Sequence, residues 1–242
     1  MLRAQPIRIG TAGWSIASDY VAQFPLGGSH LERYARRLAG VEINSSFYKP
    51  HRRSTYERWA ISTPNDFQFS VKLPRAISHE QALVSCEEPL SRFLDAVSGL
   101  GKKLGVVLVQ LPPRFEFDDA VFERFFDEFR RRSDVSVAIE PRHASWFADK
   151  VAERLTRRRI ARVASDPARA ASGGLPGGWA GLCYYRWHGA PRVYYSSYDS
   201  TELASMAARL LEEKQRQTWF VFDNTASGAA LSNALELSSL IE

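Results

Sequence analysis

Cysteine is scarce in this sequence and long apolar runs are missing, and both features narrow the class of protein. The 242 residues include two cysteines, Cys86 and Cys183, which are far apart and form no CxxC pair. This usage disfavours a disulfide scaffold or a zinc knuckle and is typical of a reducing compartment. No apolar run approaches the roughly 20 residues that span a bilayer, and residues 1–10 lack a secretory apolar core. We therefore expect a cytoplasmic protein without a membrane partner.

The chain also lacks a charge excess that would demand a nucleic-acid partner. The net charge is +5 and the pI is near 9.3. Much of the excess lies in Arg130–Arg132 and Arg157–Arg159, at the ends of expected helices, where cations stabilise the negative end of the helix dipole. Solvated helix ends are therefore favoured over contacts with nucleic acid. A small anionic substrate is the expected partner, and the composition leaves the oligomeric state open.

Short apolar, β-branched runs alternate with longer amphipathic stretches from end to end. The expected strands cover residues 7–14, 40–47, 67–74, 104–112, 135–142, 161–166, 181–189 and 218–224. The expected helices cover residues 30–39, 54–62, 87–103, 118–132, 145–159, 199–217 and 227–242. One unit is irregular, because the Gly- and Pro-rich residues 167–180 follow the sixth strand in place of a helix.

This regular alternation predicts a single α/β domain over residues 1–242, a (β/α)₈ TIM barrel. An open, doubly wound sheet is the alternative. That fold usually carries fewer strands and a GxGxxG turn after the first strand, whereas residues 10–14 read GTAGW. The barrel is therefore the preferred fold.

Polar residues gather at the carboxyl ends of the expected strands, where barrels place their active sites. The period of two along a strand puts Glu42 and Asn44 on one face, and likewise Arg186 and His188. Charges buried there must pair with one another or bind a ligand, because an unpaired buried charge is costly. One interpretation is a structural ion-pair network that fills the top of the barrel. Clustering at nearly every strand end favours a functional site.

Several segments match a known family in order and over nearly the whole chain. They are GTAGW, VEINSSFY, FSVKLPRAISH, LVQLPP, AIEPRHASW, YRWHG and FDNTASGAALSNA. The chain in this respect resembles the DUF72 (YecE-like) family of (β/α)₈ proteins. The resemblance implies a TIM barrel and, because the function of the family is unknown, no particular reaction. The chain departs from the family pattern at Ala12, where Ser is usual, over residues 15–28, and at Asp223, where an Asn pair is common.

The favoured function is acid–base catalysis on a small anionic or phosphorylated substrate, with no cofactor. Lys72, Arg142 and Arg186 would bind the anion, while a glutamate would transfer the proton with assistance from a histidine. The predicted catalytic residues are Glu42, Lys72, Glu140 and His188. The predicted substrate-binding residues are Trp14, Asn44, Tyr48, Gln110, Arg142, Arg186, Asn224 and Thr225.

Lys72 and the start of the last helix each allow two interpretations. A desolvated lysine with a lowered pKa can form a Schiff base. The neighbouring carboxylates are expected to raise the pKa of Lys72, so an anion-binding or electrophilic role ranks first.

At the start of the last helix, residues 225–230 could bind a phosphate through free backbone N–H groups, or Thr225 or Ser227 could simply cap the helix.

Other functions remain open alternatives. A divalent-metal enzyme of the phosphoesterase or sugar isomerase type would use Glu140, Asp166 and His188 as ligands. A non-catalytic barrel would bind nucleic acid or another ligand through aromatic and basic side chains. A retaining glycosidase ranks low, because Gln110 and His188 stand where its carboxylates are usually found.

Overall fold

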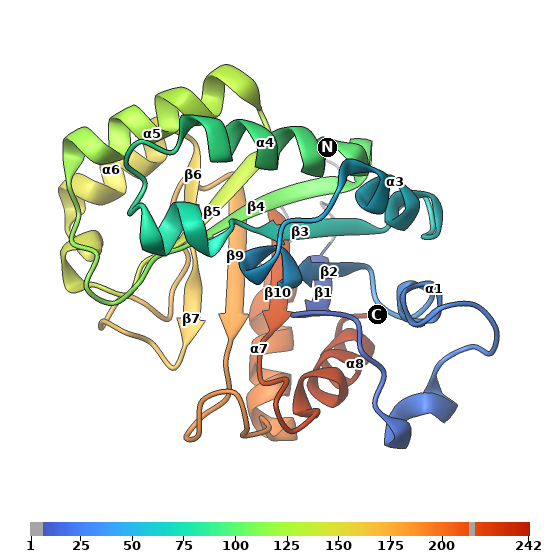
Figure 1. Ribbon diagram of the computed structural model, residues 1–242. Helices are drawn as coiled ribbons and strands as arrows, with labels where there is room; N and C mark the ends of the chain where they lie inside the picture. The colour runs from blue at the N-terminus through green and yellow to red at the C-terminus, as the bar shows by residue number, and fades with distance from the viewer. Residues whose placement is uncertain (1–6, 213–215) are drawn as a thin grey trace, which may run out of the picture.

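The computed structural model describes residues 7–212 and 216–242, in which parallel strands alternate with helices (Figure 1). The strands are β1 (Ile7–Thr11), β2 (Gly40–Ile43), β3 (Gln68–Lys72), β4 (Leu104–Gln110), β5 (Ser136–Glu140), β6 (Ile160–Arg162), β7 (Ala164–Asp166), β8 (Gly177–Gly178), β9 (Leu182–Trp187) and β10 (Gln217–Phe222). The helices are α1 (His30–Ala35), α2 (Ser45–Tyr48), α3 (Arg53–Ile61), α4 (Glu87–Val97), α5 (Asp119–Arg132), α6 (Asp149–Arg157), α7 (Ser200–Glu212) and α8 (Ala229–Ile241). Short segments of tighter or wider helix lie at η1 (Ser18–Gln23), η2 (Ala76–Glu80), η3 (Ser98–Lys103) and η4 (Ala144–Phe147).

The strands form two sheets. One has the order β2-β3-β4-β5-β6-β8 and the other the order β1-β10-β9-β7. All neighbours are parallel except β8, which pairs antiparallel with β6. The sheets meet at one bridge, between Ala12 and Glu42, and through Val163, which separates β6 from β7. The mixed α/β fold with parallel strands in sequence order agrees with the prediction, but the described residues show no closed barrel.

The seam between β1 and β2 contains a tyrosine in place of a regular ladder. The buried hydroxyl of Tyr34 accepts a hydrogen bond from Thr11 N (2.9 Å) and donates one to Gly40 O (3.2 Å). The strands approach closely here, because a Cβ added to Gly10 would lie 2.0 Å from Gly40 O. The phenol therefore satisfies two backbone groups that a continuous sheet would pair directly.

Apolar side chains form two layers, as the alternation along the strands requires. A small inner cluster between the two sheets includes Leu108, Tyr184, Trp219 and Val221. Trp219 fills this interior so tightly that a Cβ on Gly105 would lie 2.6 Å from its ring. A larger cluster packs the outer faces of the sheets against the helices. In Figure 1, α4, α5 and α6 lie along the longer sheet, whereas α7 and α8 lie beside β9, β10 and β1.

The predicted elements are mostly present, with shifts at their ends. The strand expected over 40–47 ends at Ile43, because Asn44 is already in a helical conformation at the start of α2. The helix expected over 87–103 divides into α4 and η3, and Gly101 within η3 has a φ of +55°. The irregular segment 167–180 contains the two-residue strand β8 and no helix. Part of the helix expected over 199–217 falls on residues 213–215, which lie outside the described residues.

Both cysteines are buried, and neither forms a disulfide within the described residues. The arginine triplets contact acidic neighbours: Arg131 and Arg132 pair with Glu128, and Arg158 pairs with Glu123 and Asp127. Among the described helices, none is long and apolar enough to cross a bilayer.

Candidate functional site

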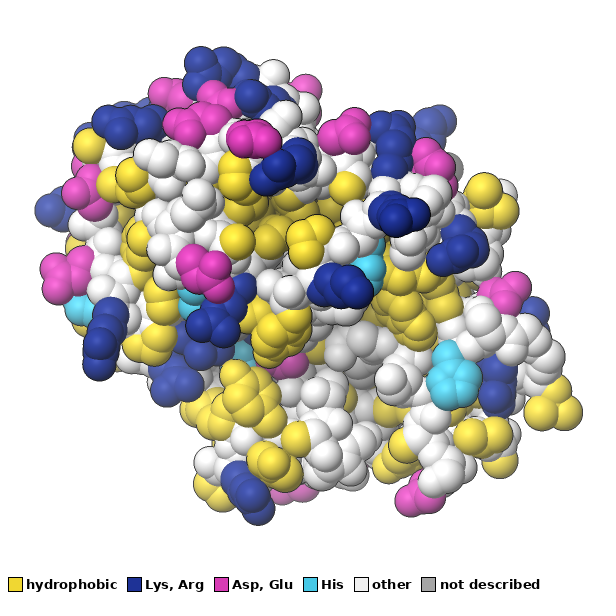
Figure 2. Space-filling view, viewed as in Figure 1, with side chains coloured by type: hydrophobic (Ala, Val, Ile, Leu, Met, Phe, Trp, Pro, Cys, Tyr) yellow, Lys and Arg dark blue, Asp and Glu magenta, His cyan; other side chains and the backbone are white. Residues whose placement is uncertain are grey.

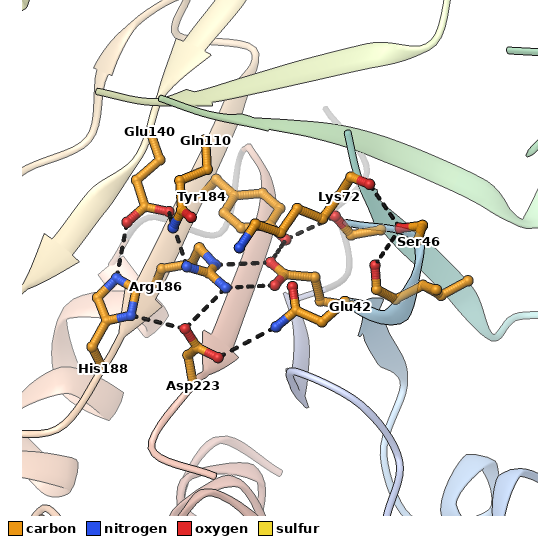
Figure 3. A network of polar contacts seen from close by, with 12 residues as sticks. Glu42, Ser46, Lys72, Gln110, Glu140, Tyr184, Arg186, His188 and Asp223 are labelled. Carbon is orange, nitrogen blue, oxygen red and sulfur yellow. Dashed lines mark hydrogen bonds and ion pairs between the residues drawn. The ribbon is translucent and has the colours of Figure 1, made fainter. Parts of the chain in front are cut away.

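Arg186 lies at the centre of a buried network of polar side chains (Figure 3). Its side chain is fully buried, and all three guanidinium nitrogens are engaged. Nε and Nη2 donate to the two carboxylate oxygens of Glu42, at 2.9 and 2.7 Å. Nη1 donates to Glu140 Oε2 at 2.9 Å, and Nη2 lies 3.1 Å from Asp223 Oδ2. One cation therefore holds three carboxylates in fixed positions.

The network joins the two sheets. Glu42 belongs to β2, and Glu140 ends β5, so both come from the longer sheet. Arg186 comes from β9, and Asp223 directly follows β10, so both belong to the shorter sheet. The parallel strands bring these side chains to the same end of the molecule, as their positions near the carboxyl ends of strands predict.

His188 lies between the carboxylates of Glu140 and Asp223, both of which also contact Arg186. Its Nε2 lies 2.9 Å from Glu140 Oε1, and its Nδ1 lies 3.0 Å from Asp223 Oδ2. Burial opposes the charged ring, but the two carboxylates outweigh burial and raise the pKa of His188. For Glu140, burial opposes ionisation, while Arg186 and His188 hold the pKa well below its usual range. Each ring nitrogen faces a carboxylate oxygen, and only the imidazolium form can donate to both.

Neutral side chains complete the hydrogen bonding of the glutamates. The hydroxyl of Tyr184 donates to Glu42 Oε2 at 2.8 Å and lies 2.8 Å from Ser70 Oγ. Gln110 Nε2 donates to Glu140 Oε2 at 2.8 Å. Burial, followed by the charge of Glu42, raises the pKa of Tyr184 well above its usual value. Both glutamates are therefore fixed by several donors and lack rotational freedom.

Lys72 differs from the other cations of the site because no carboxylate of the described residues holds it. Only 7% of its surface is exposed, and its Nζ lies 4.1 Å from the centre of the Phe47 ring. Within residues 7–212 and 216–242, this Nζ has no hydrogen-bond or ion-pair partner, and Figure 3 shows it pointing toward the Arg186 network. Burial and then the charge of Arg186 lower the pKa of Lys72 to about 8.

The lowered pKa of Lys72 corrects the expectation from the sequence. Glu42, Glu140 and Asp223 do favour the charged amine, but burial and Arg186 outweigh them. The physical reason is that Arg186 already neutralises these carboxylates, so little attraction is left for a second cation.

Two further basic side chains lie at this edge of the network. Arg142 is partly buried, with Nη2 3.9 Å from Glu140 Oε1 and 3.5 Å from the hydroxyl of Tyr194. Its Nε is buried without a hydrogen-bond partner in the described structure. His79 stacks edge-on with Phe47, and burial, Lys72 and Arg142 lower its pKa. Figure 2 shows Lys and Arg side chains around histidine near the middle of this face. We call Lys72, His79 and Arg142 the basic mouth.

The structure brings half of the predicted residues into direct contact within the network. These are Glu42, Gln110, Glu140, Arg186 and His188, with Asn44 joined through a 3.4 Å hydrogen bond to Asp223. Lys72 and Arg142 lie at its edge.

The remaining predicted residues lie elsewhere. Trp14 packs edge-on against Trp59 at 4.9 Å, and Tyr48 is exposed above Phe47. Asn224 is buried on the opposite side of the chain from Asp223, and its Nδ2 donates to Ser196 O and to Asn233 Oδ1, each at 2.9 Å. Asn224 thus anchors the start of α8 and faces away from the network.

Thr225 lines a separate cavity of about 550 Å³ together with Thr11, Gly13 and Ser227. The prediction that Thr225 or Ser227 caps the last helix is wrong. The N-cap of α8 is Gly228, whose φ is +82°, and no side chain of the described residues caps the helix. Ser227 Oγ instead donates to Tyr195 O at 2.6 Å.

The three alternative metal ligands are not brought together. The carboxylate of Asp166 accepts a hydrogen bond from the hydroxyl of Tyr198 at 2.7 Å and lines another cavity, of about 310 Å³, beside α7. Both ring nitrogens of His188 already face carboxylates. Within the described residues, no group of three or more His, Cys, Asp or Glu is arranged to hold a metal ion.

Sequence reasoning missed several members of the network. Asp223, Tyr184 and Ser70 were not among the predicted residues, although period two points to each of them. Asp223 follows the inward-facing Val221 by two residues, and Tyr184 precedes Arg186 by two. The same alternation places the next residue, Asn224, on the opposite face of the strand, away from the network.

Comparisons with known proteins agree with this fold. Residues 8–242 match the family model "Protein of unknown function DUF72". The UPF0759 protein YecE of Escherichia coli K12 is 32% identical over 143 residues, covering 59% of this chain and 50% of YecE, so the chain matches about half the length of that relative. The UPF0759 protein YunF of Bacillus subtilis is 23% identical over 98% of this chain and 95% of YunF.

Solved structures resemble the chain along almost its full length. A DUF72 family protein from Enterococcus faecalis V583 has a TM-score of 0.82 and 24% identity, covering 98% of this chain and 95% of that one. A DUF72 family protein from Thermotoga maritima MSB8 has a TM-score of 0.77 and 24% identity over 97% and 98% of the two chains. A sugar phosphate isomerase/epimerase from Parabacteroides distasonis has a TM-score of 0.53 and 10% identity over 98% and 96%, a likeness of fold alone.

Proposed function

Because the chain belongs to the DUF72 family of proteins of unknown function, we propose a function from the site itself: acid–base catalysis on a small anionic substrate bound at the basic mouth. The observation that carries this proposal is the state of Lys72. Among the described residues it is a buried amine without a carboxylate partner, and both it and the partly buried Arg142 lie close enough to His79 to lower the pKa of that ring. An anion placed between them would satisfy the free donors of both side chains in a poorly solvated site, where such hydrogen bonds are strong.

Arg186 has a different role in this proposal from the one expected from the sequence. Four of its five N–H groups contact protein carboxylates and its side chain is fully buried, so it is not available to bind a substrate anion. We assign it to positioning: it fixes Glu42 and Glu140 below the substrate. Anion binding then falls to Lys72 and Arg142.

Proton transfer is also reassigned. Glu42 and Glu140 are held by Arg186, and the lowered pKa of Glu140 makes that carboxylate a weak base near neutral pH. Lys72, with a pKa of about 8, exchanges its proton most readily in the range where enzymes usually work. Arg186, the two glutamates and Asp223 set the electrostatic field in which Lys72 titrates. In this proposal the two sheets act together as a TIM barrel with its site at the carboxyl ends of the strands.

The proposal is tested by titrating the protein with inorganic sulfate and inorganic phosphate, using calorimetry between pH 6.5 and 9.5. Lys72→Met should weaken binding about 10-fold or more, because a hydrogen bond to a charged group contributes about 1.5–3 kcal/mol. Lys49→Met removes an exposed lysine near the same rim and serves as the matched control. Sulfate affinity should fall as the pH rises through about 8, when Lys72 loses its proton. Equal affinities for Lys72→Met and the parent protein would refute the proposal.

The alternative functions have less support. The proposed metal ligands are divided between two sides of the strands, since Asp166 faces Tyr198. A nucleic-acid surface would need free basic side chains, whereas Arg131, Arg132 and Arg158 pair with glutamates or aspartates.

A further inference from the structure

The amino group of Lys72 has the surroundings of a nucleophile as well as those of an anion-binding cation. We propose that Lys72 forms a covalent imine with the carbonyl carbon of a small anionic aldehyde or oxo acid, whose acid group binds Arg142. This inference rests on the proposed function, because it uses the same basic mouth to hold the anion. It adds the class of substrate and the bond that forms.

The geometry around Lys72 leaves its nitrogen available for attack. Phe47 lies against the amine on one side at 4.1 Å, and an aromatic ring can accept a cation without trapping its lone pair once the amine is neutral. No described carboxylate or carbonyl oxygen accepts a hydrogen from Nζ. Lys72 keeps 7% of its surface exposed, and its unpartnered Nζ is not among the fully buried polar atoms of the described residues, so the nitrogen retains contact with solvent.

Charged groups face Lys72 from several elements, and together with burial they lower the pKa of the amine toward neutrality. Burial and then the charge of Arg186 of β9 act against the ammonium. Glu42, Glu140 and Asp223 act in its favour but are neutralised by Arg186. The resulting pKa of about 8 gives a useful fraction of free base at pH 7.5.

Lys103 shows what a structural lysine looks like in the same molecule. Its Nζ donates to Ala60 O (2.6 Å), Thr63 O (2.6 Å) and Thr63 Oγ1 (3.0 Å), so all three ammonium hydrogens are engaged. Burial lowers the pKa of Lys103 as well. Lys103, which is less buried and has three hydrogen-bond acceptors where Lys72 has none among the described residues, is an internal control for reactivity.

The reaction balances without any further reagent. The neutral amine of Lys72 adds to the carbonyl carbon and gives a carbinolamine. The C–O bond then breaks, and the oxygen leaves as water with one amine hydrogen and one proton from solvent. The other amine hydrogen stays on the iminium nitrogen. Arg142, whose Nε is buried and has no described hydrogen-bond partner, supplies a donor for the acid group of the substrate.

The test uses the unmodified protein with glyoxylate as probe and cyanoborohydride as trap at pH 7.5. Reduction of the imine leaves one carboxymethyl group on the lysine, which peptide mass spectrometry locates and times. At this pH a lysine with a pKa of 8 has roughly 200 times more free base than one with the ordinary value. Even with restricted access, labelling at Lys72 should be at least about 10-fold faster than at the exposed Lys102, and Lys103 should be the slowest of the three.

The probe and its controls separate this inference from the proposed function. Propionaldehyde, which has no acid group, should label Lys72 more slowly than glyoxylate, and Arg142→Gln should remove that difference. Labelling of Lys72 no faster than Lys102 overturns the imine. If Lys72→Met nevertheless loses sulfate affinity, the anion site and the proposed function stand. If both measurements are negative, both proposals fail.

Discussion

Replacing Arg186 by methionine should destabilise the protein more than any surface substitution. The variant leaves Glu42, Glu140 and Asp223 buried with one cation fewer, and the methionine keeps much of the volume of the side chain. Breaking a buried ion pair from one side costs about 3–5 kcal/mol, because the remaining charge has lost its partner. Since the whole domain is stable by about 5–15 kcal/mol, the loss is a large share of the total.

The deficit should depend on pH with a definite sign. In the parent protein Arg186 helps to hold the pKa values of Glu140 and Asp223 below their usual range, so this stabilisation exists above about pH 4 and is lost as the pH falls. In the variant, burial acts on these carboxylates without Arg186 and raises their pKa values. The folded variant then binds more protons than the unfolded chain, and its stability falls as the pH rises. The difference between the two proteins should therefore be larger at pH 8 than at pH 5.

Urea unfolding followed by tryptophan fluorescence at pH 5 and pH 8 measures this difference. Arg92→Met, which removes an exposed ion pair with Glu88, is the control and should cost under about 1 kcal/mol. If Arg186→Met does not fold at pH 8, the double variant with Glu42→Gln should recover part of the stability by removing one buried charge. A loss below about 1 kcal/mol at both pH values, or a double variant less stable than the single one, would refute the electrostatic reasoning.

Two further predictions concern stability. Lys72→Met should raise the free energy of unfolding by up to about 3 kcal/mol at pH 7, because the folded-state pKa of about 8 lies below 10.5 and the buried ammonium is costly. That gain should shrink between pH 8 and pH 10.5, and a difference in melting temperature that is equal at pH 7 and pH 10 would contradict it. Tyr34→Phe should cost about 1–3 kcal/mol and speed amide exchange at Thr11, because Thr11 N and Gly40 O lose their partner. Unchanged exchange at Thr11 would show that the seam does not depend on the phenol.

The sequence predicted the direction in which side chains point better than it predicted their partners. Alternation along a strand is local, so the spacing of Glu42 and Arg186 within their own strands is enough to assign both to inward faces. Their pairing depends on the order and stagger of strands far apart in the chain, which local spacing does not encode. The sequence therefore predicted that Arg186 binds a substrate anion, whereas in the structure it contacts three protein carboxylates.

The places where the sheets are interrupted also could not be predicted from the local pattern of apolar and polar residues. Residues 161–166 have the composition of one strand, yet Val163 separates β6 from β7, which belong to different sheets. The seam beside β1 depends on Tyr34, a residue of α1 that looks in the sequence like an ordinary buried aromatic. Both features arise from tertiary packing, which overrides strand propensity.

The division into two sheets has a consequence for the order in which the chain is synthesised. The longer sheet uses only residues 40–178, so all its strands leave the ribosome before β9 exists. It then carries Glu42 and Glu140 without the arginine that neutralises them. The shorter sheet needs both ends of the chain, and its arrival brings Arg186. Glu42 and Glu140 therefore lack Arg186 until the last quarter of the chain emerges, and the polar network can form only once nearly the whole chain has been made.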